Sequence, residues 1–88
     1  MAYTVEYEKK AIRQLSKLDN GTSKLIINWI EKNLINTDNP RSNGKSLKGD
    51  LKEYWRYRVG SYRIIAEIND NKLIILLVNI AHRKEVYK

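Results

Sequence analysis

The chain has 88 residues, 42% of them hydrophobic and 31% charged, so we expect one packed domain spanning residues 1–88 rather than a disordered segment. Seventeen Lys and Arg against ten Asp and Glu give a net charge of +7, which favours an acidic partner: nucleic acid, an acidic protein or an anionic membrane. The absence of cysteine excludes disulfides and thiolate chemistry. No signal peptide or membrane-spanning run is evident, so we expect a cytoplasmic protein without membrane association.

The first half of the chain predicts one strand and two helices. Apolar and polar residues alternate over Ala2–Tyr7, which is the period of a half-buried strand. Over Glu8–Leu18 the apolar residues recur every three or four positions and Lys or Arg lie between them, as in an amphipathic helix. A short turn leads to a second helix, which Thr22 or Ser23 would cap and which runs to about Thr37. We expect the two helices to form a hairpin.

The second half predicts a sheet. Asp38–Gly49 is polar and rich in turn-forming pairs, which indicates an irregular connection that exposes Lys45 and Lys48. Three strands follow, separated by short turns: about Glu53–Val59, Tyr62–Ile68 and Lys72–Ala81. The last is almost continuously apolar, which is typical of a central strand covered on both faces. We expect an α+β fold, in the order β-α-α-β-β-β, with an antiparallel sheet and the helical hairpin packed on one face.

Arginines concentrate in these strands. Alternation places Arg56 and Arg58 on one face of their strand, with apolar neighbours on the other face. Arg63 begins the next strand and Arg83 follows the last one, so a meander can bring four guanidinium groups together. Because arginines repel one another and do not lose their protons, such a cluster suits a bound phosphate.

A plainer interpretation of the arginines stays open at this point. On a solvated sheet face they would pair with acidic neighbours such as Glu53, Glu67 or Asp70 and contribute little free energy. The residues alone favour neither interpretation.

Two residues near the end of the sequence are suited to proton transfer. His82 is the only histidine, and Tyr87 follows it five positions later among several cations, which can lower a tyrosine pKa. Each also has a structural explanation, as an incidental residue at a strand end or as a cover for the sheet edge. The sequence has no cluster of metal ligands and no glycine-rich phosphate loop, so we expect neither a metal nor a cofactor.

Three segments together resemble the RelE/ParE superfamily of toxin–antitoxin modules, and within it the RelE-like mRNA interferases. They are Leu47–Gly49, Tyr54–Arg63 with its Gly-Ser-Tyr-Arg end, and His82–Tyr87. The resemblance covers nearly the whole chain. It implies a type II toxin that enters the ribosomal A site and cuts mRNA by attack of a ribose 2′-OH on the adjacent phosphate, without a metal ion.

The resemblance also implies roles for individual residues. Arg63 and Arg83 match positions that bind and neutralise the scissile phosphate, while Arg56 and Arg58 stand where RelE has alternating lysines. Tyr87 falls at the family's terminal tyrosine and His82 at a histidine that other members use, so either could transfer the proton. We therefore expect a catalytic set made of Arg56, Arg63, His82, Arg83 and Tyr87, and an RNA-binding set made of Lys45, Lys48, Arg58 and Lys84.

The resemblance further implies partners and rival functions. An acidic cognate antitoxin would form a hetero-oligomer with the toxin, alongside the ribosome and mRNA as targets. A ParE-like member would instead inhibit DNA gyrase by protein–protein contact. A third reading is a non-catalytic nucleic-acid-binding module, in which Tyr54 or Tyr57 would stack on bases.

Overall fold

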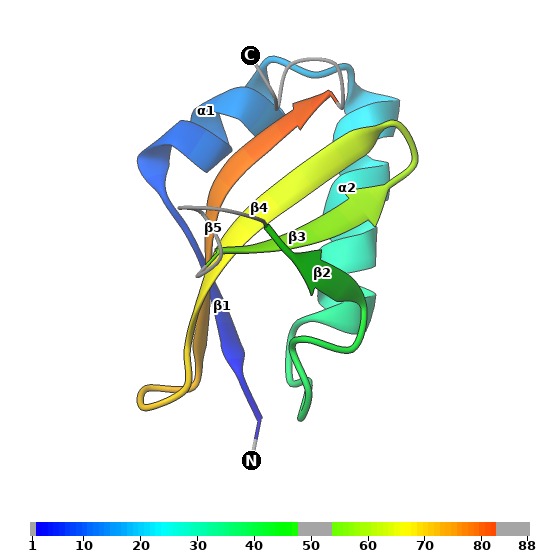
Figure 1. The fold of residues 1–88 in the computed structure, drawn as a ribbon. Coiled ribbons are helices and arrows are strands. Elements are labelled where there is room, and N and C mark those ends of the chain that lie inside the picture. Colours follow the sequence, from blue (N-terminus) through cyan, green and yellow to red (C-terminus); the bar gives the residue numbers. More distant parts are fainter. Residues whose placement is uncertain (1, 48–53, 83–88) are drawn as a thin grey trace.

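Two helices pack on one face of a five-stranded sheet (Figure 1). The structure is a computed structural model, which describes residues 2–47 and 54–82. In chain order the elements are β1 (Thr4–Tyr7), α1 (Lys9–Ser16), α2 (Asn20–Asn33), β2 (Gly44–Ser46), β3 (Tyr54–Val59), β4 (Tyr62–Asn69) and β5 (Ile74–His82). The predicted α+β class and the helical hairpin on one face are confirmed. No helix within the described ranges is long and apolar enough to cross a membrane.

The sheet has the strand order β1-β5-β4-β3-β2. From β2 to β5 the strands form the predicted antiparallel meander, but β1 pairs in parallel with β5, so the sheet is mixed rather than wholly antiparallel. The strand β2 is a second difference, because it lies in the segment predicted to be irregular. It is only three residues long and its sequence, Gly-Lys-Ser, carries no apolar alternation. Its strand conformation is set by its pairing with β3 and cannot be predicted from the polarity pattern of its own three residues.

The second helix begins and ends earlier than predicted. The carboxylate of Asp19 accepts hydrogen bonds from the backbone N of Thr22, at 3.0 Å, and from its hydroxyl, at 2.7 Å, so Asp19 is the N-cap and α2 starts at Asn20. The prediction that Thr22 or Ser23 caps this helix is therefore wrong. At the other end Asn36 has a φ of 64°, a left-handed conformation that asparagine tolerates and that takes the chain out of the helix before Thr37.

The core lies between the two helices and the inner face of the sheet. Its largest fully buried side chains are those of Ile26, Ile30, Leu34, Tyr57, Ile64, Ile75 and Leu77. The outer face of β5 is different, because Ile74 and Leu76 remain half-buried. The strand β5 is interior, between β4 and β1, so its central position is confirmed, while Ala81 on its outer face is buried and cover along the rest of that face stays a prediction.

A side chain of α1 completes the free edge of β5. The pairing of β1 with β5 ends at Leu77, and within residues 2–47 and 54–82 no strand continues along that side of β5. There the Oε1 atom of Gln14 accepts a hydrogen bond from the backbone N of Ile80, and its Nε2 atom donates to Asn79 Oδ1, each at 2.6 Å. The amide of Gln14 thus replaces the missing backbone partner at this edge.

Candidate nucleic-acid interface

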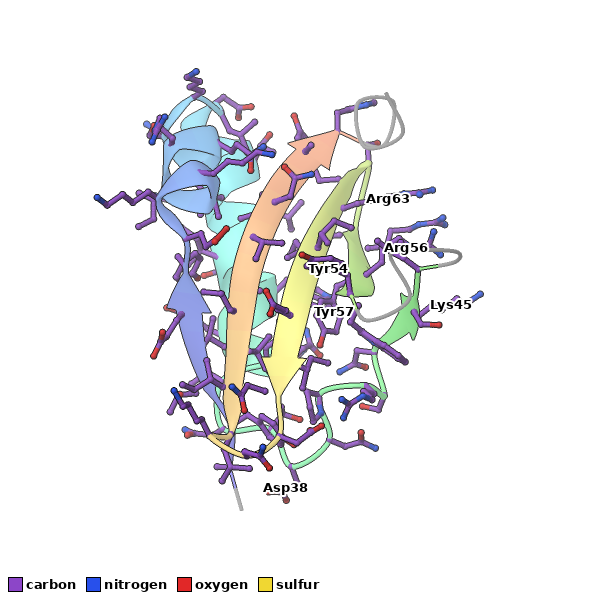
Figure 2. The ribbon with its side chains drawn as sticks, turned by 60° about the vertical axis from the view of Figure 1, so that its left-hand side comes forward. Asp38, Lys45, Tyr54, Arg56, Tyr57 and Arg63 are labelled. Carbon is purple, nitrogen blue, oxygen red and sulfur yellow. The ribbon has the colours of Figure 1, made fainter. Side chains whose placement is uncertain are left out.

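Four cations share the face of the sheet that the helices leave uncovered. Lys45 lies directly opposite Arg56 in the β2–β3 pair, and Arg58 lies opposite Arg63 in the β3–β4 pair. Opposite residues share a face, as do residues two positions apart on one strand. Figure 2 shows Lys45, Arg56 and Arg63 pointing away from the helices on the same side of the sheet. The predicted placement of Arg56 and Arg58 on one face is confirmed, and we name this surface the cation face (Lys45, Arg56, Arg58 and Arg63).

Both cross-strand pairs on the cation face join like charges. Like charges directly opposite each other destabilise a sheet, so these pairs are unfavourable in the isolated protein. Of the acids that the plainer interpretation names, Asp70 is bound by Arg41, whereas Glu67 lies opposite Tyr54, on the same face as the cations and diagonal to Arg56. Glu53 lies outside the described residues. Among these paired positions four cations face one carboxylate, that of Glu67, so the excess of positive charge favours the binding of an external anion.

A pocket of ≈ 380 Å³ opens beside the cation face. Its lining consists of Ser42, Asn43, Gly44, Lys45, Arg56 and Arg58. Three of these side chains are cationic, and the others bring a hydroxyl, a carboxamide and bare backbone. Residues 2–47 and 54–82 contain no group of three His, Cys, Asp or Glu side chains close enough to hold a metal ion. The pocket has the chemistry to receive a phosphate together with a polar group attached to it.

Polar contacts hold Pro40 and Arg41, the segment that precedes the pocket. The guanidinium of Arg41 donates to both carboxylate oxygens of Asp70, at 3.0 and 2.9 Å, and the hydroxyl of Tyr3 donates to Asp70 Oδ1 at 2.6 Å. The hydrogen bonds from Arg41 and then Tyr3 lower the pKa of Asp70 to about 2, and the bond to Asp70 in turn raises the pKa of Tyr3. The buried hydroxyl of Tyr57 donates to the carbonyl of Pro40. The turn between β4 and β5 and the buried Tyr57 thus both fasten this segment, and Tyr3, just before β1, holds the turn.

Gly44 allows β2 to approach β3 closely. A Cβ atom at this position would lie 2.4 Å from the backbone O of Arg56 and 2.6 Å from Nε1 of Trp55. The indole of Trp55 fills the space that a side chain would need, and the guanidinium of Arg41 lies over it at 5.9 Å. The Asn43-Gly44 pair was predicted to form a turn, but in the structure its glycine allows two strands to lie close together. Arg41 and Asn43 were not predicted as functional residues, and only their place beside Pro40 and Gly44 could have suggested them.

His82 does not lie on the cation face. It is opposite Tyr62 in the β4–β5 pair, and the two rings meet edge to face with centroids 5.4 Å apart. A register shift after Ile65 explains this orientation, because an extra residue in β5 reverses which side chains face the helices. Of the other predicted site residues, Lys48, Arg83, Lys84 and Tyr87 lie outside the described part of the chain.

The two tyrosines of β3 have opposite environments. Tyr57 is fully buried, so the expectation that it stacks on a nucleic-acid base is wrong, and burial raises its pKa. Its ring contacts Trp29 with centroids 5.6 Å apart. Tyr54 is half-exposed and lies on the same face as Arg56, two positions along the strand. Tyr54 is the tyrosine of this strand that a base can reach.

The fold is that of a known class of small toxins. Residues 5–87 match the family model described as "ParE toxin of type II toxin-antitoxin system, parDE", and the chain belongs to this family. The predicted resemblance to the RelE/ParE superfamily is thereby confirmed.

Relatives with assigned names agree with this membership. The chain is 27% identical to toxin RelG of Mycobacterium tuberculosis over 88 residues (100% of this chain, 99% of that protein). It is 29% identical to toxin RelE of the same organism over 86 residues (98% and 87%). The protein is therefore a type II toxin of the RelE/ParE family.

Solved structures show the same fold. The toxin–antitoxin complex RelBE2 from M. tuberculosis contains a chain with a TM-score of 0.85 and 26% identity, covering 97% of this chain and 95% of that one. A mutant of E. coli toxin RelE in the free state gives a TM-score of 0.77 at 18% identity, covering 99% and 90%, which shows the fold alone.

Proposed function

We propose that this toxin is a ribosome-dependent endoribonuclease that cuts mRNA in the A site without a metal ion or cofactor. The observation that carries the proposal is the cation face, where two like-charge pairs lie side by side on the face of the sheet opposite the helices. In the proposed reaction a ribose 2′-oxygen bonds to the adjacent phosphorus as the bond to the 5′-oxygen breaks. The products are a 2′,3′-cyclic phosphate and a 5′-hydroxyl. Arg56, Arg58 and Arg63 would stabilise the negative charge that grows on the phosphate oxygens.

Proton transfer is assigned to Tyr87, with Arg83 as a further phosphate ligand. The reaction removes a proton from the 2′-hydroxyl and delivers one to the 5′-oxygen, so it needs an acid–base group beside the phosphate. The ring of His82 meets that of Tyr62 edge to face, on the side of the sheet that faces the helices, and this position favours Tyr87 for the role. Lys45, Lys48 and Lys84 would contact neighbouring phosphates of the RNA.

The proposal includes an acidic antitoxin as the second partner. Solved complexes of similar toxins pair each toxin with an antitoxin, and the +7 charge of this chain suits an acidic one. An antitoxin that covers the cation face would block RNA binding and form a hetero-oligomer. Because ribosomes and mRNA are the proposed targets, we place the toxin in the cytoplasm.

A second candidate is inhibition of DNA gyrase by protein–protein contact. The matched family model is named for ParE, and in the described ranges the cation face has no histidine beside it. A non-catalytic module that binds nucleic acid through the same cations is a third candidate. Both alternatives use the same fold, so activity assays must separate them.

Primer extension on a defined mRNA tests the proposal. Purified toxin is added in excess chelator, with and without ribosomes that have an empty A site. We expect cuts only with ribosomes, and a loss of roughly 10²–10⁴-fold in rate for Tyr87→Phe, the range for a general acid or base. His82→Gln and the exposed helical variant Arg13→Ala should retain the wild-type rate.

Other outcomes contradict the proposal in different ways. If the wild-type toxin makes no cuts, the nuclease reading fails, and a DNA supercoiling assay with gyrase decides on the second candidate. If Tyr87→Phe cuts normally while His82→Gln does not, the assignment of the proton to Tyr87 is wrong.

A further inference from the structure

The pocket beside the cation face has two chemically different sides. On one side lie the charged groups of Lys45, Arg56 and Arg58, which suit a phosphate. On the other lie Ser42 and Asn43 from the loop before β2. Contacts to phosphate carry no sequence information, so selectivity for particular RNA sequences must come from the loop side or from other surfaces.

Asn43 is the side chain of this loop that is available to a ligand. The hydroxyl of Ser42 donates to the carbonyl of Asn39 at 3.1 Å and is thereby engaged within the loop. Among the interactions of the described residues, none involves the carboxamide of Asn43, which is exposed and lines the pocket. A carboxamide presents a hydrogen-bond acceptor and a donor side by side.

The loop that carries Asn43 is anchored on both sides. Before it, Arg41 is fixed to Asp70 by two hydrogen bonds. After it, Gly44 is paired with Tyr57 and covered by Trp55. The position of Asn43 relative to the arginines of β3 is therefore set before a ligand arrives, which lowers the entropic cost of binding.

We propose that Asn43 determines base specificity in this toxin, by reading the base of the nucleotide whose phosphate lies on Arg56 and Arg58. The inference rests on the proposed function in taking RNA as the ligand. A pocket of ≈ 380 Å³ is of a size to admit one nucleotide. The edge of adenine, with the N6 amino group next to N7, matches the acceptor and donor of a carboxamide in a two-bond contact. Bases of single-stranded RNA expose such edges.

Mapping cut positions on an mRNA pool with randomised codons tests this inference. We expect the wild-type toxin to favour adenine at one fixed position relative to the cut, by roughly 5- to 150-fold, the range for one bidentate base contact. Asn43→Ala should flatten that preference while ribosome-dependent cutting continues. In Asn43→Asp the carboxylate only accepts hydrogen bonds, so the preference should move towards cytosine, whose N4 donates. Asn28→Ala, on the exposed side of α2, is the matched control and should keep the wild-type profile.

A binding assay keeps the inference separate from the nuclease proposal. Fluorescence anisotropy measures the affinity of the same proteins for short oligomers of A, C and U, without ribosomes. If the wild-type toxin cuts but Asn43→Ala has the same cut profile, the inference is overturned and the nuclease proposal stands. If the wild-type toxin does not cut, the nuclease proposal fails, and the binding assay alone decides whether Asn43 reads a base. A preference for oligo(A) that Asn43→Ala loses and Asn28→Ala keeps would support the inference. If the preference for oligo(A) changes equally in both variants, the inference is overturned.

Discussion

Gly44→Ala tests how the sheet builds the pocket. The new Cβ would lie 2.4 Å from the backbone O of Arg56, and a backbone atom cannot rotate away. The strand β2 must therefore move off β3, and the indole of Trp55 must shift as well, as in an overpacked core, at a cost of ~1–3 kcal/mol. Restricting the unfolded chain offsets roughly 0.4–1 kcal/mol of that cost. A net loss of about 1–2 kcal/mol lowers the melting temperature by ~4–16 °C in a domain of this size.

Thermal unfolding followed by circular dichroism measures this loss. Gly21→Ala is the matched control, because the nearest atom to its new Cβ is a side-chain oxygen of Asp19 at 3.3 Å and the position is helical. It should melt at or above the wild-type temperature. Gly44→Ala should also bind RNA more weakly, since Lys45 moves with β2. If Gly44→Ala melts as high as Gly21→Ala, our account of the β2–β3 approach is wrong.

Four further changes test other parts of the structure. Arg56→Ala should reduce the slope of log affinity against log salt by about 0.7 on single-stranded RNA, and an unchanged slope would show that Arg56 contacts no phosphate. The folded-state pKa of Asp70 is lowered from 3.8 to about 2, so the stability that its carboxylate contributes is present above pH 3.8 and is lost as the pH falls through 2. In urea unfolding across this pH range, the stability of Asp70→Asn should not show that acid-dependent loss. Tyr57→Phe leaves the Pro40 carbonyl without its donor and should cost ~1–3 kcal/mol in urea unfolding, while Tyr54→Phe should cost little. Arg58→Thr removes a like-charge pair with Arg63 and should stabilise the free protein by ~0.2–1 kcal/mol while weakening RNA binding, so a loss of stability would contradict the electrostatic argument.

Local patterns in the sequence predicted most of the fold. Alternation over Tyr54–Val59 and the apolar run of β5 are properties of neighbouring residues, and both strands were found where they were expected. The parallel pairing of β1 with β5 joins Thr4 to Ile74, and no local pattern specifies a partner so far along the chain. The N-cap was also ambiguous, because Asp19 and Thr22 are both capping residues and the choice depends on how α1 delivers the chain.

The site was predicted only in part because it depends on register. Alternation within β3 was enough to place Arg56 and Arg58 together, and it also placed Tyr57 on the buried side. For His82 simple alternation predicts the wrong face, because the register shift in the β4–β5 pair reverses which side chains near the end of β5 face the helices. The sequence of β5 has no glycine or proline to mark this irregularity. A bulge of this kind is visible only from the pairing of both strands.

The cation face shows a conflict between stability and binding. Arg58 opposite Arg63 and Lys45 opposite Arg56 raise the free energy of the isolated fold, in a chain whose small core leaves little stability to spare. An anionic partner removes this repulsion and binds only the folded state, so at a concentration 100 times its Kd it adds about 2.7 kcal/mol. An acidic antitoxin and an RNA would both supply that stabilisation by covering the same charges. Under the proposed function both partners bind the cation face, so they should compete for it, and the free toxin should be the least stable of the three states.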